Sequence, residues 1–157
     1  MSNILRMHRS RSLLKNLWRH TNPYWKIGYE DSRTLGLTEV DVDDMVFAKP
    51  PVTRNGEIIL ESWLTKINAS GDHVPLSAQV GFSLRRRNSI HHLEYLRLRK
   101  GITEMDFPGT IFRDPQGVNC ILRLWHSRVW NYCFWSHRWP TSSPSVVIAK
   151  IRAHPRV

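Results

Sequence analysis

The sequence predicts a mainly β protein: an antiparallel β-sandwich or barrel-like domain that follows a basic amphipathic N-terminal helical arm. Three observations indicate this fold class. Apolar and polar residues alternate strictly between Val74 and Leu84, which is the period of a half-buried strand. Further short apolar segments are separated by Gly, Pro and Asn, as in sandwiches and barrels. Every charged residue before Glu30 is basic, and apolar residues there recur at helical spacing.

The composition limits the class of protein. A chain of 157 residues fits one domain of ordinary size with a short arm. Because 41% of the residues are hydrophobic and seven are Trp, the chain has enough apolar surface to form a core. No apolar run reaches the ~18 residues that a membrane-spanning helix needs. The formal net charge of +10 predicts an anionic partner.

The charges divide the chain into three regions. These are a basic arm with an aromatic segment (1–29), an acidic linker with the first strand (30–56) and a β-rich domain (57–157). The linker carries the densest acidic cluster, Asp41, Asp43 and Asp44. In one interpretation, the arm of one subunit contacts the acidic cluster of another. In the alternative, both are unrelated solvated surfaces.

Residues 3–20 are predicted to form the helix of the arm. Its apolar face contains Ile4, Met7, Leu14, Leu17 and Trp18. The helix is expected to end before Pro23, since proline disfavours helix in the preceding residue. The residues predicted to bind an anionic membrane or another anion are Arg6, Arg9, Arg11, Leu14, Lys15, Leu17, Trp18 and Arg19.

A basic amphipathic helix of this kind has four uses. It can lie on an anionic membrane, or it can neutralise nucleic-acid phosphates. It can be an import presequence, because it is rich in Arg and Ser and lacks acidic residues. It can also pack on its own domain. A secretory signal is excluded, because Arg and Lys interrupt every apolar stretch.

The remaining elements are predicted to be strands. The candidates, in order, are 40–47, 57–67, 74–84, 93–98, 118–125, 129–135 and 146–151. Residues 101–117 contain Pro108-Gly109 and Asp114-Pro115, and they are predicted to form a loop with a short helical turn.

Cys120 and Cys133 are predicted to face each other across a hairpin that turns at His126-Ser127. Nothing in the sequence indicates an oxidising compartment, so we expect two reduced, buried thiols. A zinc site that adds His126 and His137 to the two cysteines is the alternative. Its spacing matches no common zinc pattern.

Two basic clusters are predicted, one at the C-terminal end of the strand 74–84 and one at the C-terminal end of the strand 93–98. If these strands pair, the first cluster lies beside His91 and His92 at the turn. Guanidinium groups form forked hydrogen bonds to phosphate oxygens, so an anionic partner is expected. The alternative is ordinary solvated charge. The predicted nucleic-acid-binding residues are Arg85, Arg86, Arg87, Arg97, Arg99 and Lys100.

No known catalytic motif is present in the sequence. It contains no Gly-rich phosphate loop, no Gly-x-Ser-x-Gly and no His-Glu-x-x-His. The acidic run Asp41-x-Asp43-Asp44 lacks the rest of a calcium-binding loop. We therefore expect a protein that is not an enzyme and that has no cofactor and no metal.

The layout of the chain resembles that of small matrix proteins of negative-strand RNA viruses, rhabdovirus-type matrix proteins in particular. The matching parts are the arm Met1–His20, the aromatic segment Tyr24–Tyr29 and the body from about residue 39. The resemblance implies a structural virion protein that self-associates and bridges an anionic membrane and the nucleocapsid or RNA. The usual Pro-Pro-x-Tyr motif is absent, and Pro50-Pro51-Val52-Thr53 does not replace it.

A local resemblance points to a second function. Residues 69–87, from Ala69-Ser70-Gly71-Asp72 through the alternating strand, are similar to part of tobamovirus-type movement proteins. A basic arm before a β-sandwich is also the plan of small viral coat proteins. An RNA-binding coat or movement protein is therefore the alternative function, and an imported mitochondrial ribosome-type protein is the third. The expected locations are the virion and the host cytoplasm or inner membrane face, or else the mitochondrion.

Overall fold

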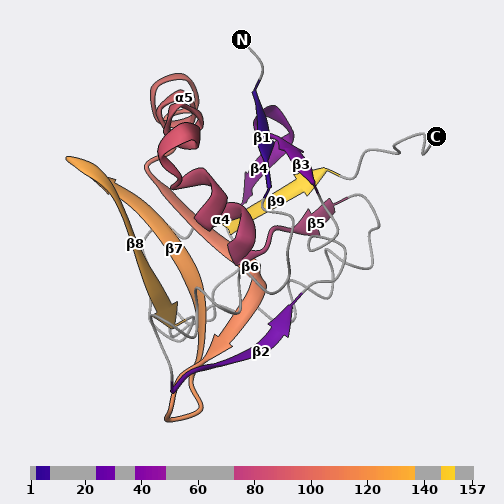
Figure 1. Cartoon of the computed structure of the whole chain (residues 1–157), viewed down its shortest axis with the longest axis vertical. Helices are drawn as coiled ribbons and strands as arrows, with labels where there is room; N and C mark the ends of the chain where they lie inside the picture. The colour runs from indigo at the N-terminus through magenta and orange to yellow at the C-terminus, as the bar shows by residue number, and fades with distance from the viewer. Residues whose placement is uncertain (1–2, 8–23, 31–37, 49–72, 137–145, 151–157) are drawn as a thin grey trace.

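A computed structural model of the chain describes residues 3–7, 24–30, 38–48, 73–136 and 146–150 (Figure 1). The early elements are β1 (Ile4–Arg6), β2 (Lys26–Glu30), β3 (Glu39–Asp41), the 3₁₀ turn η1 (Val42–Asp44), β4 (Met45–Ala48) and β5 (His73–Pro75). The later elements are α4 (Ala78–Leu84), the 3₁₀ turn η2 (Arg87–Ser89), α5 (Ile90–Lys100), β6 (Glu104–Arg113), β7 (Asn119–Ser127), β8 (Val129–Ser136) and β9 (Val146–Lys150).

A seven-stranded sheet forms the body of the domain (Figure 1). Five strands follow the order β4-β9-β6-β7-β8, while β2 pairs with β6 and β5 pairs with β9. The pairing is antiparallel throughout, except that β9 runs parallel to β6 at Asp106. The prediction of a mainly β, antiparallel fold is confirmed. The described strands do not close into a barrel.

The N-terminal segment is part of this domain where the structure describes it. Residues 4–6 form a strand, β1, that pairs antiparallel with β3, so the predicted helix is wrong at these positions. Leu5 is fully buried and Met7 is 7% exposed. The predicted helical residues 8–20 lie outside the described part of the chain. The start of the arm is therefore packed in the fold and not free to detach.

The predicted strand 74–84 is wrong beyond β5, because residues 78–84 form helix α4. The alternation failed as a signal since α4 is enclosed on nearly all sides: Gln79, Gly81 and Ser83 are buried together with their apolar neighbours. A helix that is buried all round shows no polar face. The alternating strand that contributed to the movement-protein resemblance is thus a helix.

Gly81 allows α4 to pack closely on the sheet. A Cβ atom at this position would lie 2.6 Å from Leu122 Cδ2 on β7 and 3.0 Å from the ring of Phe107 on β6. The helix therefore covers β6 and β7 directly, as Figure 1 shows. This contact fixes the position of the chain that leaves α4 at Arg85.

The predicted strand 93–98 is also wrong, because it lies within helix α5. The buried residues His92, Leu93 and Leu96 follow the spacing of one helical face. The helix ends at Gly101, whose φ of 68° is the left-handed conformation common at helix ends. The basic residues of the last turn complement the negative end of the helix dipole.

Residues 104–113 form β6, so the predicted loop over 101–117 is wrong for most of its length. Pro108 and Gly109 lie where the register between β6 and β7 shifts, between Phe107 and Phe112. Proline and glycine are tolerated in a strand at such an irregularity. The Gly109 N–H donates to the Leu76 carbonyl at 2.8 Å.

The strands predicted for the last third of the chain are confirmed, but the predicted register of the hairpin between β7 and β8 is wrong. The predicted strands 118–125, 129–135 and 146–151 correspond to β7, β8 and β9. The hairpin turns at Arg128, whose φ is 66°, and not at His126-Ser127. As a result Cys120 lies opposite Ser136, and Cys133 lies opposite Arg123.

The cysteines therefore lie on opposite faces of the sheet, because positions 120 and 123 differ by an odd number. The prediction that they face each other is wrong, and both are free. A zinc site that uses both cysteines is wrong for the same reason.

Other predictions are only partly described. The weak strand candidate 40–47 divides into β3, η1 and β4. The candidate 57–67 lies outside the described residues. The largest side chains of the described core that are under 2% exposed are Phe107, Phe112, Leu5, Leu76, Leu84, Leu93, Leu96, Met105, Leu122 and Leu124.

Candidate anion-binding surface and pocket

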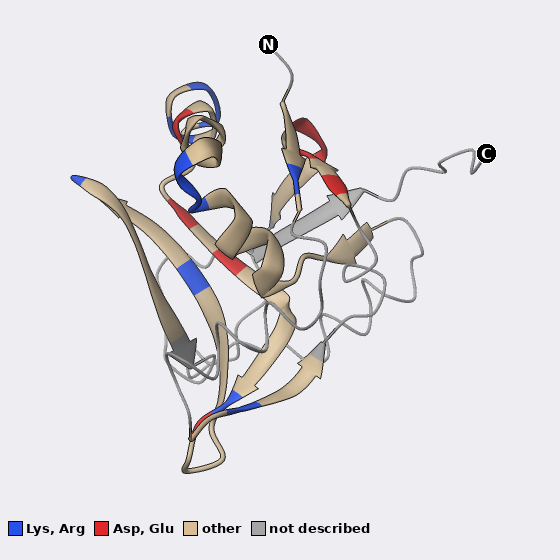
Figure 2. Cartoon of the chain, viewed as in Figure 1, with Lys and Arg blue, Asp and Glu red and all other residues tan. Residues whose placement is uncertain are grey.

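The six predicted nucleic-acid-binding residues lie at the two ends of α5. The N-side basic group consists of Arg85, Arg86 and Arg87. Arg85 and Arg86 connect α4 to η2, and Arg87 is the first residue of η2. Arg97, Arg99 and Lys100, the C-side basic group, occupy the last turn of α5. The eleven residues of the helix span about 16 Å. The structure therefore places the two predicted basic clusters along one helix (Figure 2) and not on a pair of strands.

The charge of the N-side basic group is not neutralised by any ion pair within the described part of the chain. The Arg85 guanidinium lies 4.1 Å from the centre of the Tyr132 ring on β8, a cation–π contact that orients it. Arg85 and Arg87 are exposed and Arg86 is half-buried. Among the described residues, none of the three has an acidic partner. This group can bind an anion without breaking an existing ion pair.

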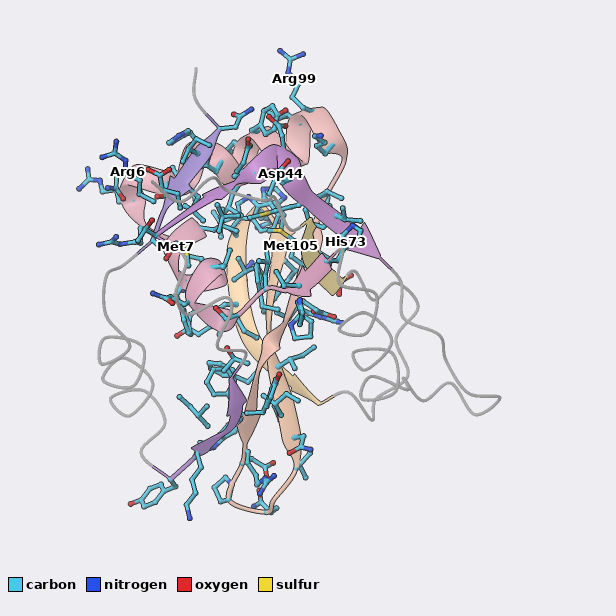
Figure 3. All side chains as sticks on the ribbon, turned by 90° about the vertical axis from the view of Figure 1, so that its right-hand side faces the viewer. Arg6, Met7, Asp44, His73, Arg99 and Met105 are labelled. Carbon is cyan, nitrogen blue, oxygen red and sulfur yellow. The ribbon has the colours of Figure 1, made fainter. Side chains whose placement is uncertain are left out.

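The C-side basic group is partly neutralised. Arg97 pairs with Glu94 one turn earlier at 2.6 Å, and Lys100 Nζ lies 3.6 Å from Asp43 Oδ1. Arg99 extends away from the domain (Figure 3) and has no acidic partner in the described part of the chain. Among the described residues, Arg99 is thus the member of this group without an ion pair.

Asp43 of the acidic cluster is engaged within its own chain. It accepts hydrogen bonds from the Tyr95 hydroxyl at 2.6 Å and from Asn3 Nδ2 at 2.7 Å. These two bonds, together with the charge of Lys100, lower the pKa of Asp43 below its ordinary value, against a smaller effect of burial. The contact joins the N-terminal segment, η1 and α5. It does not require a second subunit.

A polar pocket of about 370 Å³ lies between β1, β3 and the start of α5. Its lining residues are Ile4, Arg6, Glu39, Asn88, Ser89, His91 and His92. The rings of His91 and His92 lie 4.0 Å apart. Arg6 and the two histidines were predicted to have other roles, and no sequence pattern indicated the pocket, since its walls come from segments more than thirty positions apart.

His92 is the most enclosed of the polar lining residues, at 3% exposure. Its Nδ1 has no hydrogen-bond partner in the described structure. Burial lowers the pKa of His92, and the charge of His91 lowers it further, while a backbone hydrogen bond with Ile4 has the opposite effect. His92 is therefore a neutral imidazole at pH 7 with one unsatisfied nitrogen.

Most of the predicted arm residues cannot be placed. Arg6 is exposed on β1 and lines the pocket. The others lie outside the described residues: Arg9, Arg11, Leu14, Lys15, Leu17, Trp18 and Arg19. No helix in the described part of the chain is long and apolar enough to cross a membrane.

Two further findings concern metal ligands and thiols. Within the described ranges, no group of three or more His, Cys, Asp or Glu side chains is arranged to hold a metal ion. Burial raises the pKa of the Cys120 thiol to about 11, and burial also raises that of Cys133. Neither thiol is set up as a nucleophile.

Comparison with known proteins found no match to this chain among family models, curated proteins or solved structures. The function is therefore inferred from the basic groups and the pocket.

Proposed function

We propose that this protein is a non-enzymatic structural protein that binds RNA, of the matrix-like viral type that its layout resembles. The N-side basic group carries the proposal. Arg85, Arg86 and Arg87 are consecutive, and no acidic residue of the described structure pairs with them. Phosphate contacts by Arg supply most of the affinity of sequence-independent nucleic-acid binding.

The fold supports this role because it holds the N-side basic group in place. Helix α4 is buried against β6 and β7, so its C-terminal end has a fixed position. Arg85 is further oriented by Tyr132. Arg99 and Lys100 lie at the far end of α5, a helix about 16 Å long, so an extended strand lying along the helix would meet both groups.

Membrane binding and self-association remain predictions of the sequence, since the arm beyond Met7 lies outside the described residues. One observation argues against the mitochondrial alternative. A presequence is removed after import, but removal here would delete β1 and the fully buried Leu5. The packing of residues 3–7 in the core therefore fits an N-terminal segment that is retained better than one that is removed.

The proposal is tested by fluorescence anisotropy with a labelled single-stranded RNA of about twenty nucleotides, a length that spans several phosphate contacts. The variant R85Q/R86Q/R87Q should lose most of the affinity. The matched control K26Q/R113Q/R128N removes the same charge from exposed positions elsewhere. It should lose much less. Equal losses in the two variants would overturn the proposal, because they would show an effect of net charge alone.

A further inference from the structure

We propose that the pocket between β1, β3 and the start of α5 is a binding site for a single phosphate group, held by Arg6, His91 and His92. This inference goes beyond the RNA-binding surface, since no residue of the N-side basic group lines the pocket. The two sites can therefore be tested separately.

The start of α5 supplies the first part of the argument. The first N–H groups of an α-helix have no partner within the helix, and the dipole makes this end positive. The side chain of Ser89, at the N-cap position, makes no capping hydrogen bond. The first turn also contains no acidic residue. No acidic residue of the first turn therefore offsets the positive end of α5, which lies beside the pocket at Ser89 and His91.

His92 supplies an independent part of the argument. Its side chain is 97% buried, lines the pocket and leaves Nδ1 without a partner among the described residues. The backbone hydrogen bond with Ile4 raises the pKa of His92, as expected when a ring N–H donates to a backbone carbonyl. Nδ1 is then an acceptor in the neutral ring and a donor in the imidazolium. A phosphate satisfies either form, through its O–H or its anionic oxygen.

The remaining lining residues set the charge and the size of the ligand. Arg6 and His91 are exposed cationic or polar groups at the mouth, and Asn88 adds a neutral amide. The carboxylate of Glu39 would repel an anion. Glu39 is the strand-pairing partner of Arg6 on β3, and the described structure contains no direct ion pair between the two side chains. A volume of about 370 Å³ is at the lower end of small-molecule sites, so a phosphate monoester fits better than a large ligand.

The test is calorimetric titration of the full chain with inorganic phosphate at constant ionic strength. Saturable binding at one site is expected. R6Q should weaken it about tenfold or more, because a charged hydrogen-bond donor is lost. E39Q should tighten it by about threefold, because a repelling charge is removed. K26Q, on the distant strand β2, should leave it unchanged.

Parallel titrations with a nucleoside 5′-monophosphate and with glycerol 3-phosphate distinguish a nucleotide source from a lipid-headgroup source of the same chemistry. The triple variant R85Q/R86Q/R87Q should retain phosphate binding even if RNA binding is lost. The absence of saturable binding, or equal affinities in R6Q, E39Q and the wild type, would overturn the inference. Neither outcome would bear on the RNA-binding surface.

Discussion

Arg123 on β7 and Asp106 on β6 are direct partners across the ladder, and they form a buried, two-point ion pair. Arg123 Nε lies 2.6 Å from Asp106 Oδ1, and Nη2 lies 2.9 Å from Oδ2. A second carboxylate, Glu104, lies 2.7 Å from Nη1. Arg123 is 7% exposed and Asp106 is 1% exposed. Arg123 therefore holds β6 and β7 together and is not part of a surface for a partner.

This pair predicts an asymmetric mutational effect. Asp106→Asn should destabilise the protein by about 3–5 kcal/mol, because Arg123 would be left buried without its full charge partner. Replacing both residues, as D106L/R123M, should cost less than the single change. The free energy of unfolding from urea titration monitored by circular dichroism checks this. A double variant less stable than D106N would contradict the account.

Gly109 predicts a second large effect. A Cβ atom here would lie 2.6 Å from the backbone carbonyl oxygen of Pro75 and 2.7 Å from the Ser77 nitrogen. Backbone atoms cannot move aside as a flexible side chain can, so Gly109→Ala should destabilise by on the order of 3 kcal/mol. Gly28→Ala is the control, because its nearest atom would lie at 3.5 Å. Similar unfolding midpoints for the two variants would show that β6 does not pack as described.

The two cysteines should be unreactive in the folded protein. A thiol with a pKa of about 11 carries almost no thiolate at pH 8, and Cys120 is also buried. Iodoacetamide should therefore label Cys120 far more slowly in the native protein than in urea, as mass spectrometry would show. Because the cysteines lie on opposite sheet faces, mild oxidation should not join them. An intramolecular Cys120–Cys133 disulfide in the native protein would refute this register.

The stability of the fold should fall as the pH is lowered below 6.5. Burial, aided by His91, lowers the pKa of His92 from 6.5, so the unfolded chain binds a proton before the folded chain does. This contribution to stability is complete above pH 6.5 and is lost as the pH falls toward the lowered pKa of the folded state.

His92→Gln removes this titration. In a phosphate-free buffer, the wild type should lose more stability than H92Q between pH 7 and pH 5. Parallel pH profiles of the two proteins would contradict the prediction. The comparison isolates His92, since the other histidines are common to both proteins.

The sequence predicted the strands of the last third because short apolar segments there are separated by turn residues, although β7 is buried on both faces from Cys120 to Leu124. It failed for α4 because Gln79, Gly81 and Ser83 are buried in a helix that has no solvent face. For α5 a helical signal was present: His92, Leu93 and Leu96 have helical spacing, and Gly101 follows a basic last turn. That signal favoured a helix over the predicted strand.

The candidate site was likewise predicted only in part from the sequence. The six basic residues were identified from their density alone, which does not depend on fold. Their placement at the two ends of α5 depends on residues 90–100 forming a helix, which the predicted strands did not indicate. The pocket depends on β1 pairing with β3, a contact between Leu5 and Val40 that no local pattern indicates.

The most direct test of RNA binding by the N-side basic group is the dependence of affinity on salt. For single strands, the slope of log K against log salt changes by about 0.7 for each phosphate contact. Removing three contacts in R85Q/R86Q/R87Q should therefore reduce the magnitude of the slope by about 2. An unchanged slope in this variant, with RNA binding retained, would show that the phosphates are bound elsewhere on the protein.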